Sequence, residues 1–335
     1  VLQSIIQDMK EVGYNSNEEV RAKPLLLNYV NPMAMNTWYC NAIAEEEVDV
    51  IGLCHGVQHT AQLGLQWWVG ASEDELYYKA AGINHMAWFI DLKYKDPFNK
   101  NATWKDAYPI IQEHVKEEPQ LVGTEKVRFD MMDATGYFMT ESSGHLSEYL
   151  PYYLKRDDLI EKYGAGDGVN SLRHAWDLDA YESSTTKINE KAEVGETENL
   201  VLKNTPSEEY AARIINAMEY NQLFIFNGNV MNKNGGLITN LPAGCCVEVP
   251  CTANSSGIHP HGGIELPTIC AGLCSSNIWL QKAAVQGALE KNKELIFHAL
   301  MLDPNTASVC SPGEIRSMTN EMFEANQEWL EWFYS

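Results

Sequence analysis

The sequence has few basic residues, and this shortage limits the partners that the protein can bind. Its 335 residues include 24 Lys and Arg side chains against 46 Asp and Glu, so the formal net charge is −22 at pH 7. A chain with this charge repels phosphate backbones and anionic lipid headgroups. We therefore expect neither a nucleic-acid partner nor a membrane partner.

Long apolar runs and a cysteine framework are also missing. No apolar run reaches the roughly 20 residues that a membrane-spanning helix needs, and the start, VLQSIIQDMKEVGYN, lacks the basic region and cleavage pattern of a signal peptide. The cysteines, 8 in all, have no regular spacing, in a chain too large to need disulfide staples. These features predict a protein of the reducing cytoplasm.

Two motifs of common enzyme classes are absent as well. No G-x-G-x-x-G turn precedes the first predicted strand, so a dinucleotide-binding sheet would lack its phosphate-binding turn, and we expect the chain to begin within a domain. No G-x-S-x-G elbow occurs either, which argues against a serine hydrolase.

Hydrophobic residues make up 45% of the chain, enough for a large core in one domain or two closely packed ones. The first third predicts an alternation of strands and helices. Strands are expected at 25–30, 48–54, 77–84 and 87–94, with helices at 33–44 and from about 57. This alternation is typical of α/β folds with a parallel sheet.

The remaining two thirds predict a different arrangement. Residues 101–220 are expected to be largely helical, and 223–242 to form a hairpin-like segment around Asn234-Gly235-Gly236. Strand character continues in CCVEVPCTA, and helices are expected from Pro267 to Ser335. We find no internal repeat and no linker between independent domains.

Cys54 and His85 are the sharpest candidates for chemistry. Each follows an apolar strand, and if these strands are parallel neighbours, both side chains reach the same edge of the sheet. Two protein ligands would leave a divalent ion open to water and substrate. The alternative is a small buried cysteine beside a histidine that is satisfied internally, and spacing alone does not decide between them.

Three further residues have both a functional and a structural interpretation. Asn31, at a strand end before a helix, is either a ligand contact or a helix cap. His55 is either a substrate contact or a solvated loop residue. Asp130, among apolar neighbours in VRFDMM, is either a general base whose pKa is raised by burial or an ordinary cap. The segment GYFMTESSGHLSEYLPYY (136–153) combines polar groups with tyrosine rings, as a sugar site requires.

Six motifs, taken in order, carry a resemblance that covers nearly the whole chain. They are NYVNPMAMNTW, VIGLCHGVQ, AAGINHMAW, GYFMTESSGHLSEYLPYY, NLPAGCCVEVPC and MLDPNTASV. Together they resemble the NAD- and metal-dependent glycoside hydrolases of family 4, and among these most of all the α-galactosidases. That family is an exception to the two-carboxylate scheme of glycosidases.

The resemblance implies a role for each candidate. Cys54 and His85 would hold Mn²⁺, Asn31 would contact the sugar and the nicotinamide, and Asn84 would contact the sugar. His55 would bind substrate near the leaving group and take part in catalysis, with Asp130 as the base. The implied mechanism is redox elimination: NAD⁺ oxidises C3, the C2 proton is removed, the aglycone leaves, water adds, and C3 is reduced again.

The resemblance also implies the architecture. Residues 1–85 would be the later part of a Rossmann-type NAD-binding domain whose first strands are absent. Residues 86–335 would be an α+β domain, similar to that of lactate and malate dehydrogenases, for substrate, metal and oligomerisation. A homodimer or homotetramer is expected. The alternatives are an α-glucosidase or α-glucuronidase of the same family, or an inactive metal-binding remnant without the cofactor half.

Overall fold

The structure is a computed structural model that describes residues 1–14, 23–95, 103–165 and 209–334. Within these ranges the strands form one eight-stranded mixed sheet in the order β1-β2-β6-β7-β3-β4-β5, with β8 paired to β7. The strands are β1 (Leu25–Asn28), β2 (Asp49–Leu53), β3 (Leu76–Ile83), β4 (Met86–Tyr94), β5 (Lys105–Asp106), β6 (Phe224–Met231), β7 (Cys246–Asn254) and β8 (Gly257–Pro260). The expected α/β class is confirmed.

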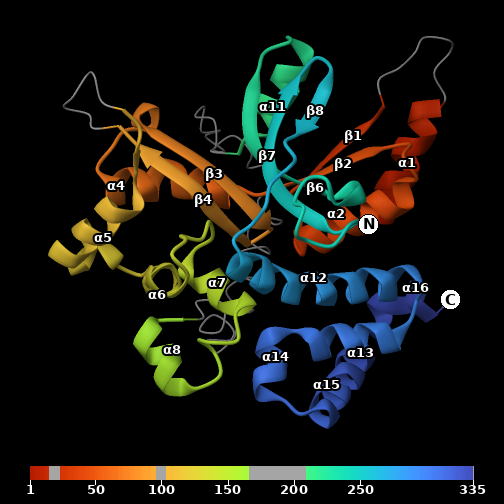
Figure 1. Ribbon diagram of the computed structural model, residues 1–335. Helices are drawn as coiled ribbons and strands as arrows, with labels where there is room; N and C mark the ends of the chain where they lie inside the picture. The colour runs from red at the N-terminus through yellow and green to blue at the C-terminus, as the bar shows by residue number, and fades with distance from the viewer. Residues whose placement is uncertain (15–22, 96–102, 166–208, 335) are drawn as a thin grey trace, which may run out of the picture.

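Helices pack around the sheet, and the C-terminal helices form a layer beneath it (Figure 1). In the first third they are α1 (Leu2–Tyr14), α2 (Met33–Ala44), α3 (Gly56–His59) and α4 (Gln66–Val69), with a π-helix at Thr60–Leu65 between the last two. The middle holds α5 (Tyr108–Glu117), α6 (Lys126–Thr135), α7 (Ser143–Tyr149), α8 (Asp157–Tyr163) and α11 (Ala211–Glu219). The C-terminal part holds α12 (Thr268–Leu289), α13 (Lys293–Leu302), α14 (Pro304–Val309), α15 (Pro312–Ala325) and α16 (Glu331–Tyr334).

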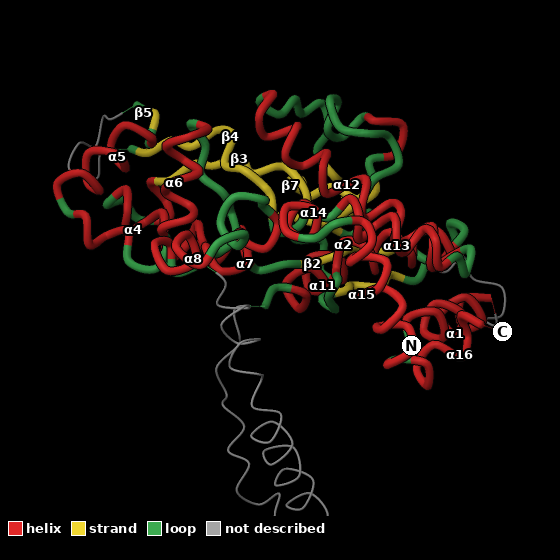
Figure 2. Tube along the Cα trace, turned by 90° about the horizontal axis from the view of Figure 1, so that it is seen from below, coloured by secondary structure: helices red, strands yellow, loops and turns green. Residues whose placement is uncertain are grey.

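The helical character predicted for 101–220 and 267–335 is confirmed for the described residues, while 166–208 lie outside them. The long helix α12 runs beneath the sheet and packs against α2, α13 and β3, and both ends of the described chain lie on one side of the molecule (Figures 1 and 2). None of the described helices combines the length and hydropathy that crossing a membrane requires.

The expected parallel sheet is only partly present. Among the named strands, β1 and β2 are paired in parallel through the crossover helix α2, and all other pairs are antiparallel. Gly52 permits this unit to close, because a Cβ there would lie 2.2 Å from the sulfur of Met33 on α2. Of the hairpin-like segment predicted at 223–242, only the first arm is a strand, β6. Its antiparallel partner is β7, which coincides with the strand predicted for CCVEVPCTA.

The prediction that Cys54 and His85 leave neighbouring parallel strands is wrong. Strands β6 and β7 lie between β2 and β3, and β3 continues directly into antiparallel β4. Only Asn84 and His85 separate β3 from β4, and two residues cannot span a parallel crossover. The expected domain boundary at residue 85 falls in this hairpin turn, and it stays a prediction.

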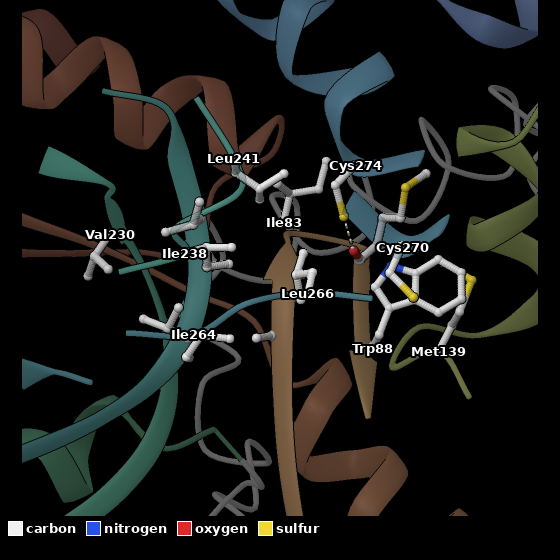
Figure 3. Close-up of a cluster of buried hydrophobic side chains, with 14 of the residues drawn as sticks. Ile83, Trp88, Met139, Val230, Ile238, Leu241, Ile264, Leu266, Cys270 and Cys274 are labelled. Carbon is white, nitrogen blue, oxygen red and sulfur yellow. Dashed lines mark hydrogen bonds between the residues drawn. The ribbon is translucent and has the colours of Figure 1, made fainter. Parts of the chain in front are cut away.

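Buried side chains hold the β3–β4 hairpin against α12. Ile83 and Trp88, on either side of the turn, pack with Cys270 and Cys274 of α12, and the thiol of Cys274 donates to the backbone oxygen of Met86 at 3.3 Å (Figure 3). The turn that carries His85 is therefore held in place by the buried hydrophobic core between β3, β4 and α12.

Candidate metal centre and substrate cavity

A cavity of about 440 Å³ lies where β1, β2 and β3 end. It is lined by Tyr29, Asn31, Met33, Leu53, Cys54, His55, Asn84, His85, Glu141, His145 and Glu209. Of the residues predicted from the sequence, the structure brings together five on this wall, namely Asn31, Cys54, His55, Asn84 and His85.

Three side chains meet at the floor of this cavity. The sulfur of Cys54, a ring nitrogen of His85 and a carboxylate oxygen of Glu141 all lie within 4.8 Å of one another. His85 and Glu141 are also well covered, with 13% and 12% of their side chains exposed. A thiolate, an imidazole and a carboxylate at this spacing fit a divalent ion and leave open positions for other oxygens.

Local structure explains why Cys54 lies at this point. It directly follows β2, and the hydroxyl of Tyr210 accepts a hydrogen bond from its backbone nitrogen at 3.3 Å and lies 3.0 Å from its backbone oxygen. Two residues later, Gly56 leaves room for the carboxylate, since a Cβ there would lie 2.7 Å from Glu141 Oε2. The absence of a side chain at Gly56 thus leaves the Glu141 carboxylate in its place beside the thiol.

His85 is oriented by its neighbours on both ring nitrogens. Its Nε2 lies 3.6 Å from Glu141 Oε2, and its Nδ1 lies 3.3 Å from the hydroxyl of Tyr149. The ring of His145 stacks on it with centroids 5.4 Å apart. A partner on Nδ1 leaves Nε2 directed at the thiol–carboxylate pair, which is the usual arrangement around a metal-binding histidine.

Burial favours the neutral forms of the Cys54 thiol and the His85 imidazole. Burial, with the nearby Glu248 carboxyl as second cause, raises the pKa of the Cys54 thiol to about 12. Burial also lowers the pKa of His85, although the Glu141 carboxylate opposes this. The imidazole is therefore in the neutral form that binds metals, and a metal would have to displace the thiol proton.

Asn31, His55 and Asn84 line the same cavity in different ways. The side-chain oxygen of Asn31 accepts from Met33 N at 3.1 Å, but the N-cap of α2 is Pro32, so Asn31 is not the helix cap itself. Asn31 also lines the cavity, and its role as a ligand contact stays a prediction. His55 is 59% exposed, with Nδ1 3.1 Å from Oε1 of Glu209. Asn84 is buried, and its amide nitrogen has no oxygen partner among the described residues.

The structure does not bring Asp130 to this cavity. Its carboxylate oxygens accept hydrogen bonds from the hydroxyls of Tyr153 at 2.8 Å and Tyr163 at 2.9 Å, and it does not line the cavity. Its surroundings are therefore tyrosine hydroxyls rather than the apolar pocket that the sequence suggested.

The sequence did not indicate Glu141 as the third side chain beside Cys54 and His85, nor Tyr149 as the partner of His85. Both lie in the segment 136–153, which attracted attention only for its mixture of polar and aromatic groups. Nor did the sequence indicate Glu209 and Tyr210, because nothing around them shows that they fold back onto the end of β2.

Comparisons with known proteins agree on one family. Residues 80–306 match the C-terminal domain of family 4 glycosyl hydrolases. The chain is 36% identical over 337 aligned residues to an α-galactosidase of Rhizobium meliloti, covering 98% of this chain and 64% of that protein. It is 37% identical to an α-galactosidase of Bacillus subtilis, covering 93% of this chain and 68% of that protein. The chain thus spans about two thirds of the length of these relatives.

Solved structures share the fold. A 6-phospho-α-glucosidase from gut microorganisms, in complex with NAD and Mn²⁺, has a TM-score of 0.68 at 18% identity, over 97% of this chain and 71% of that one. A 6-phospho-β-glucosidase from Thermotoga maritima, with manganese, NAD⁺ and glucose-6-phosphate, has a TM-score of 0.65 at 18% identity, over 98% of this chain and 71% of that one.

Proposed function

Because the chain belongs to family 4 of the glycosyl hydrolases, we propose that it carries the metal and sugar sites of an α-galactosidase that uses NAD⁺ and Mn²⁺. The observation that carries this proposal is the meeting of Cys54, His85 and Glu141 within 4.8 Å at a cavity large enough for a sugar ring. The names of the relatives support the substrate, and the complexes of the solved structures support the two cofactors.

The residues present fit the proposed metal. Cys54 and His85 would hold the ion as the resemblance implied, and Glu141 would add a hard oxygen ligand that suits Mn²⁺ better than a thiolate and an imidazole alone. The remaining positions would accept the sugar hydroxyls at C2 and C3. When bound, the ion supplies a Lewis acid at these oxygens, and NAD⁺ supplies a hydride acceptor for C3.

The described residues fit only the nicotinamide end of NAD⁺. Asn31 lines the cavity at the end of β1, where it would contact both the nicotinamide and the sugar. The residues that would hold the pyrophosphate are not identified, since these 335 residues contain no G-x-G-x-x-G turn. We therefore assign only the nicotinamide contact to this chain.

The charge of the cavity wall supports a neutral sugar. Relatives of 23–25% identity include α-galacturonidases, and another of 24% identity is a phospho-α-glucosidase, whose names imply anionic sugars. Among the described residues that line this cavity there is no Lys and no Arg, whereas Glu141 and Glu209 are both present. A carboxylate or phosphate on the sugar would find no Lys or Arg side chain among these lining residues, which favours a galactoside.

Proton transfer near the leaving group is assigned to His55. Its Nδ1 lies 3.1 Å from Glu209 Oε1, and this carboxylate orients the ring beside the cavity that both residues line. Asn84, which lines the same cavity as Cys54 and His85, would contact a sugar hydroxyl. Asp130 as the base stays a prediction that the described geometry does not support, since its oxygens bind Tyr153 and Tyr163.

The substitution Cys54→Ser tests the proposal. With NAD⁺, Mn²⁺, a thiol reductant and an aryl α-galactoside, we expect turnover by the wild-type chain and its loss in Cys54→Ser. We also expect Mn²⁺ affinity, measured by electron paramagnetic resonance without NAD⁺ or sugar, to fall more than about tenfold, because a metal ligand is lost. Cys310→Ser is the matched control, since Cys310 is the other cysteine that is partly exposed.

The two measurements separate two kinds of failure. Unchanged Mn²⁺ affinity in Cys54→Ser would reject the metal centre. Normal binding of both Mn²⁺ and NAD⁺ by the wild type without any hydrolysis of α-galactosides would retain the metal centre and reject the assigned substrate.

A further inference from the structure

A second cavity adjoins the cavity of the metal centre. Its volume is about 480 Å³, and it shares His55, Glu141 and His145 with the first cavity as wall residues. Each cavity exceeds the roughly 300 Å³ at which small-molecule sites begin. A ligand of two linked rings can therefore place one ring in each cavity, with the bond that joins them beside the shared histidines.

One wall of the second cavity offers an uncovered aromatic face. Trp67, on α4, is 63% exposed, whereas its neighbour Trp68 is buried and donates from Nε1 to the backbone oxygen of Leu121 at 3.0 Å. Trp68 thus belongs to the scaffold, while Trp67 is available to a ligand. An exposed indole ring in the same cavity lining as Thr124 and Ser142 suits a sugar, which has apolar C–H faces and polar edges.

The second cavity has no free Lys or Arg side chain, among its described lining residues, that could bind an anionic ligand. Its one Arg or Lys among the described lining residues is Arg128, which is buried and already engaged. The Nη2 of Arg128 donates to Thr60 Oγ1 at 2.7 Å and to Met139 O at 2.9 Å, and Nη1 donates to Glu125 Oε2 at 3.4 Å. Because this guanidinium is already engaged, a negatively charged ligand would find no free Lys or Arg among the described lining residues.

We propose that the second cavity binds the leaving group of the glycoside as a neutral sugar ring stacked on Trp67. Trp67 then determines specificity for the leaving group, since it is the exposed tryptophan ring among the described residues that line this cavity. This inference rests on the proposed function, which places the galactosyl ring at the metal centre.

The activity test compares two substrates that differ only in the leaving group. For a disaccharide of α-galactose linked to O6 of glucose, we expect kcat/KM to fall about tenfold in Trp67→Ala, as is typical for loss of an aromatic contact. For α-galactosyl fluoride, which has no second ring, kcat/KM should stay within about twofold. Trp104→Ala is the control, because Trp104 is 42% exposed and lines neither cavity. An equal loss for both substrates, or no loss for the disaccharide, overturns the proposal.

A binding test decides the matter independently of turnover. In the presence of Mn²⁺, we expect the wild-type chain to bind the disaccharide about tenfold more tightly than methyl α-galactoside by saturation-transfer NMR, and Trp67→Ala to remove this difference. Equal affinities in the wild type, or no binding of the disaccharide, overturn the leaving-group site. Hydrolysis of neither substrate by the wild type would instead reject the proposed function, and the binding test would still decide the role of Trp67.

Discussion

Replacing Glu248 by glutamine removes a carboxyl that is buried behind the metal centre. Glu248 lies on β7, 1% of it is exposed, and its Oε1 accepts a hydrogen bond from Asn229 at 3.4 Å. Burial, assisted by repulsion from Glu141, raises its pKa from 4.5 to about 8. Glutamine has the same size and retains the acceptor oxygen, so this exchange mainly removes the ability to ionise.

The sign of the effect follows from proton binding in the two states. Between pH 4.5 and about 8, folded Glu248 keeps a proton that the unfolded chain has lost. The free energy of unfolding of the wild type therefore falls as pH rises through this window, by about 1.4 kcal/mol for each pH unit. From pH 5 to pH 8 the loss amounts to about 4 kcal/mol, and Glu248→Gln lacks this contribution.

Chemical denaturation followed by circular dichroism measures this difference. We expect the free energy of unfolding of Glu248→Gln, relative to that of the wild type, to rise by about 4 kcal/mol from pH 5 to pH 8. This change does not depend on which of the two is more stable at pH 5. Glu219→Gln, which changes an exposed carboxyl on α11, should keep a constant difference from the wild type. If the difference between Glu248→Gln and the wild type is also the same at both pH values, the buried carboxyl ionises normally and the reasoning fails.

Two more substitutions test the packing around the site. Gly56→Ala should lower Mn²⁺ affinity about tenfold in a calorimetric titration, since its Cβ would lie 2.7 Å from Glu141 Oε2, while Gly272→Ala, where a Cβ meets open space on α12, should leave it unchanged. Equal affinity of the wild type and Gly56→Ala would show that the carboxylate is not required. Thr60→Val should lower the free energy of unfolding by about 1–3 kcal/mol in urea denaturation, because the buried Arg128 loses an acceptor at 2.7 Å. A change below about 0.5 kcal/mol would show that Thr60 does not stabilise Arg128.

The elements with strong local signals could be predicted from the sequence. The apolar runs at 25–30 and 48–54, the helix between them and the strands on both sides of His85 all occur close to the expected positions. Cys54 and Asn31 could be identified because both follow a strand, and strand ends are where α/β folds bind ligands.

The order of the strands could not be predicted. Strands β6 and β7 follow β3 by more than 130 residues in the sequence, yet in the sheet they lie between β2 and β3. Pairing between distant segments depends on which apolar faces match in space, and no periodicity within a segment records that match. Cys54 and His85 therefore meet at one cavity although the strands that precede them are not parallel neighbours.

The sequence by itself determined the residue types at the site and the position of each relative to its own strand or helix, because these depend on local propensity and hydrophobic period. Only the tertiary structure decided that Glu141 completes the group with Cys54 and His85, that Tyr149 orients His85, and that Asp130 binds tyrosine hydroxyls elsewhere. These choices depend on contacts between residues that are far apart along the chain, and such contacts form only when the whole core packs.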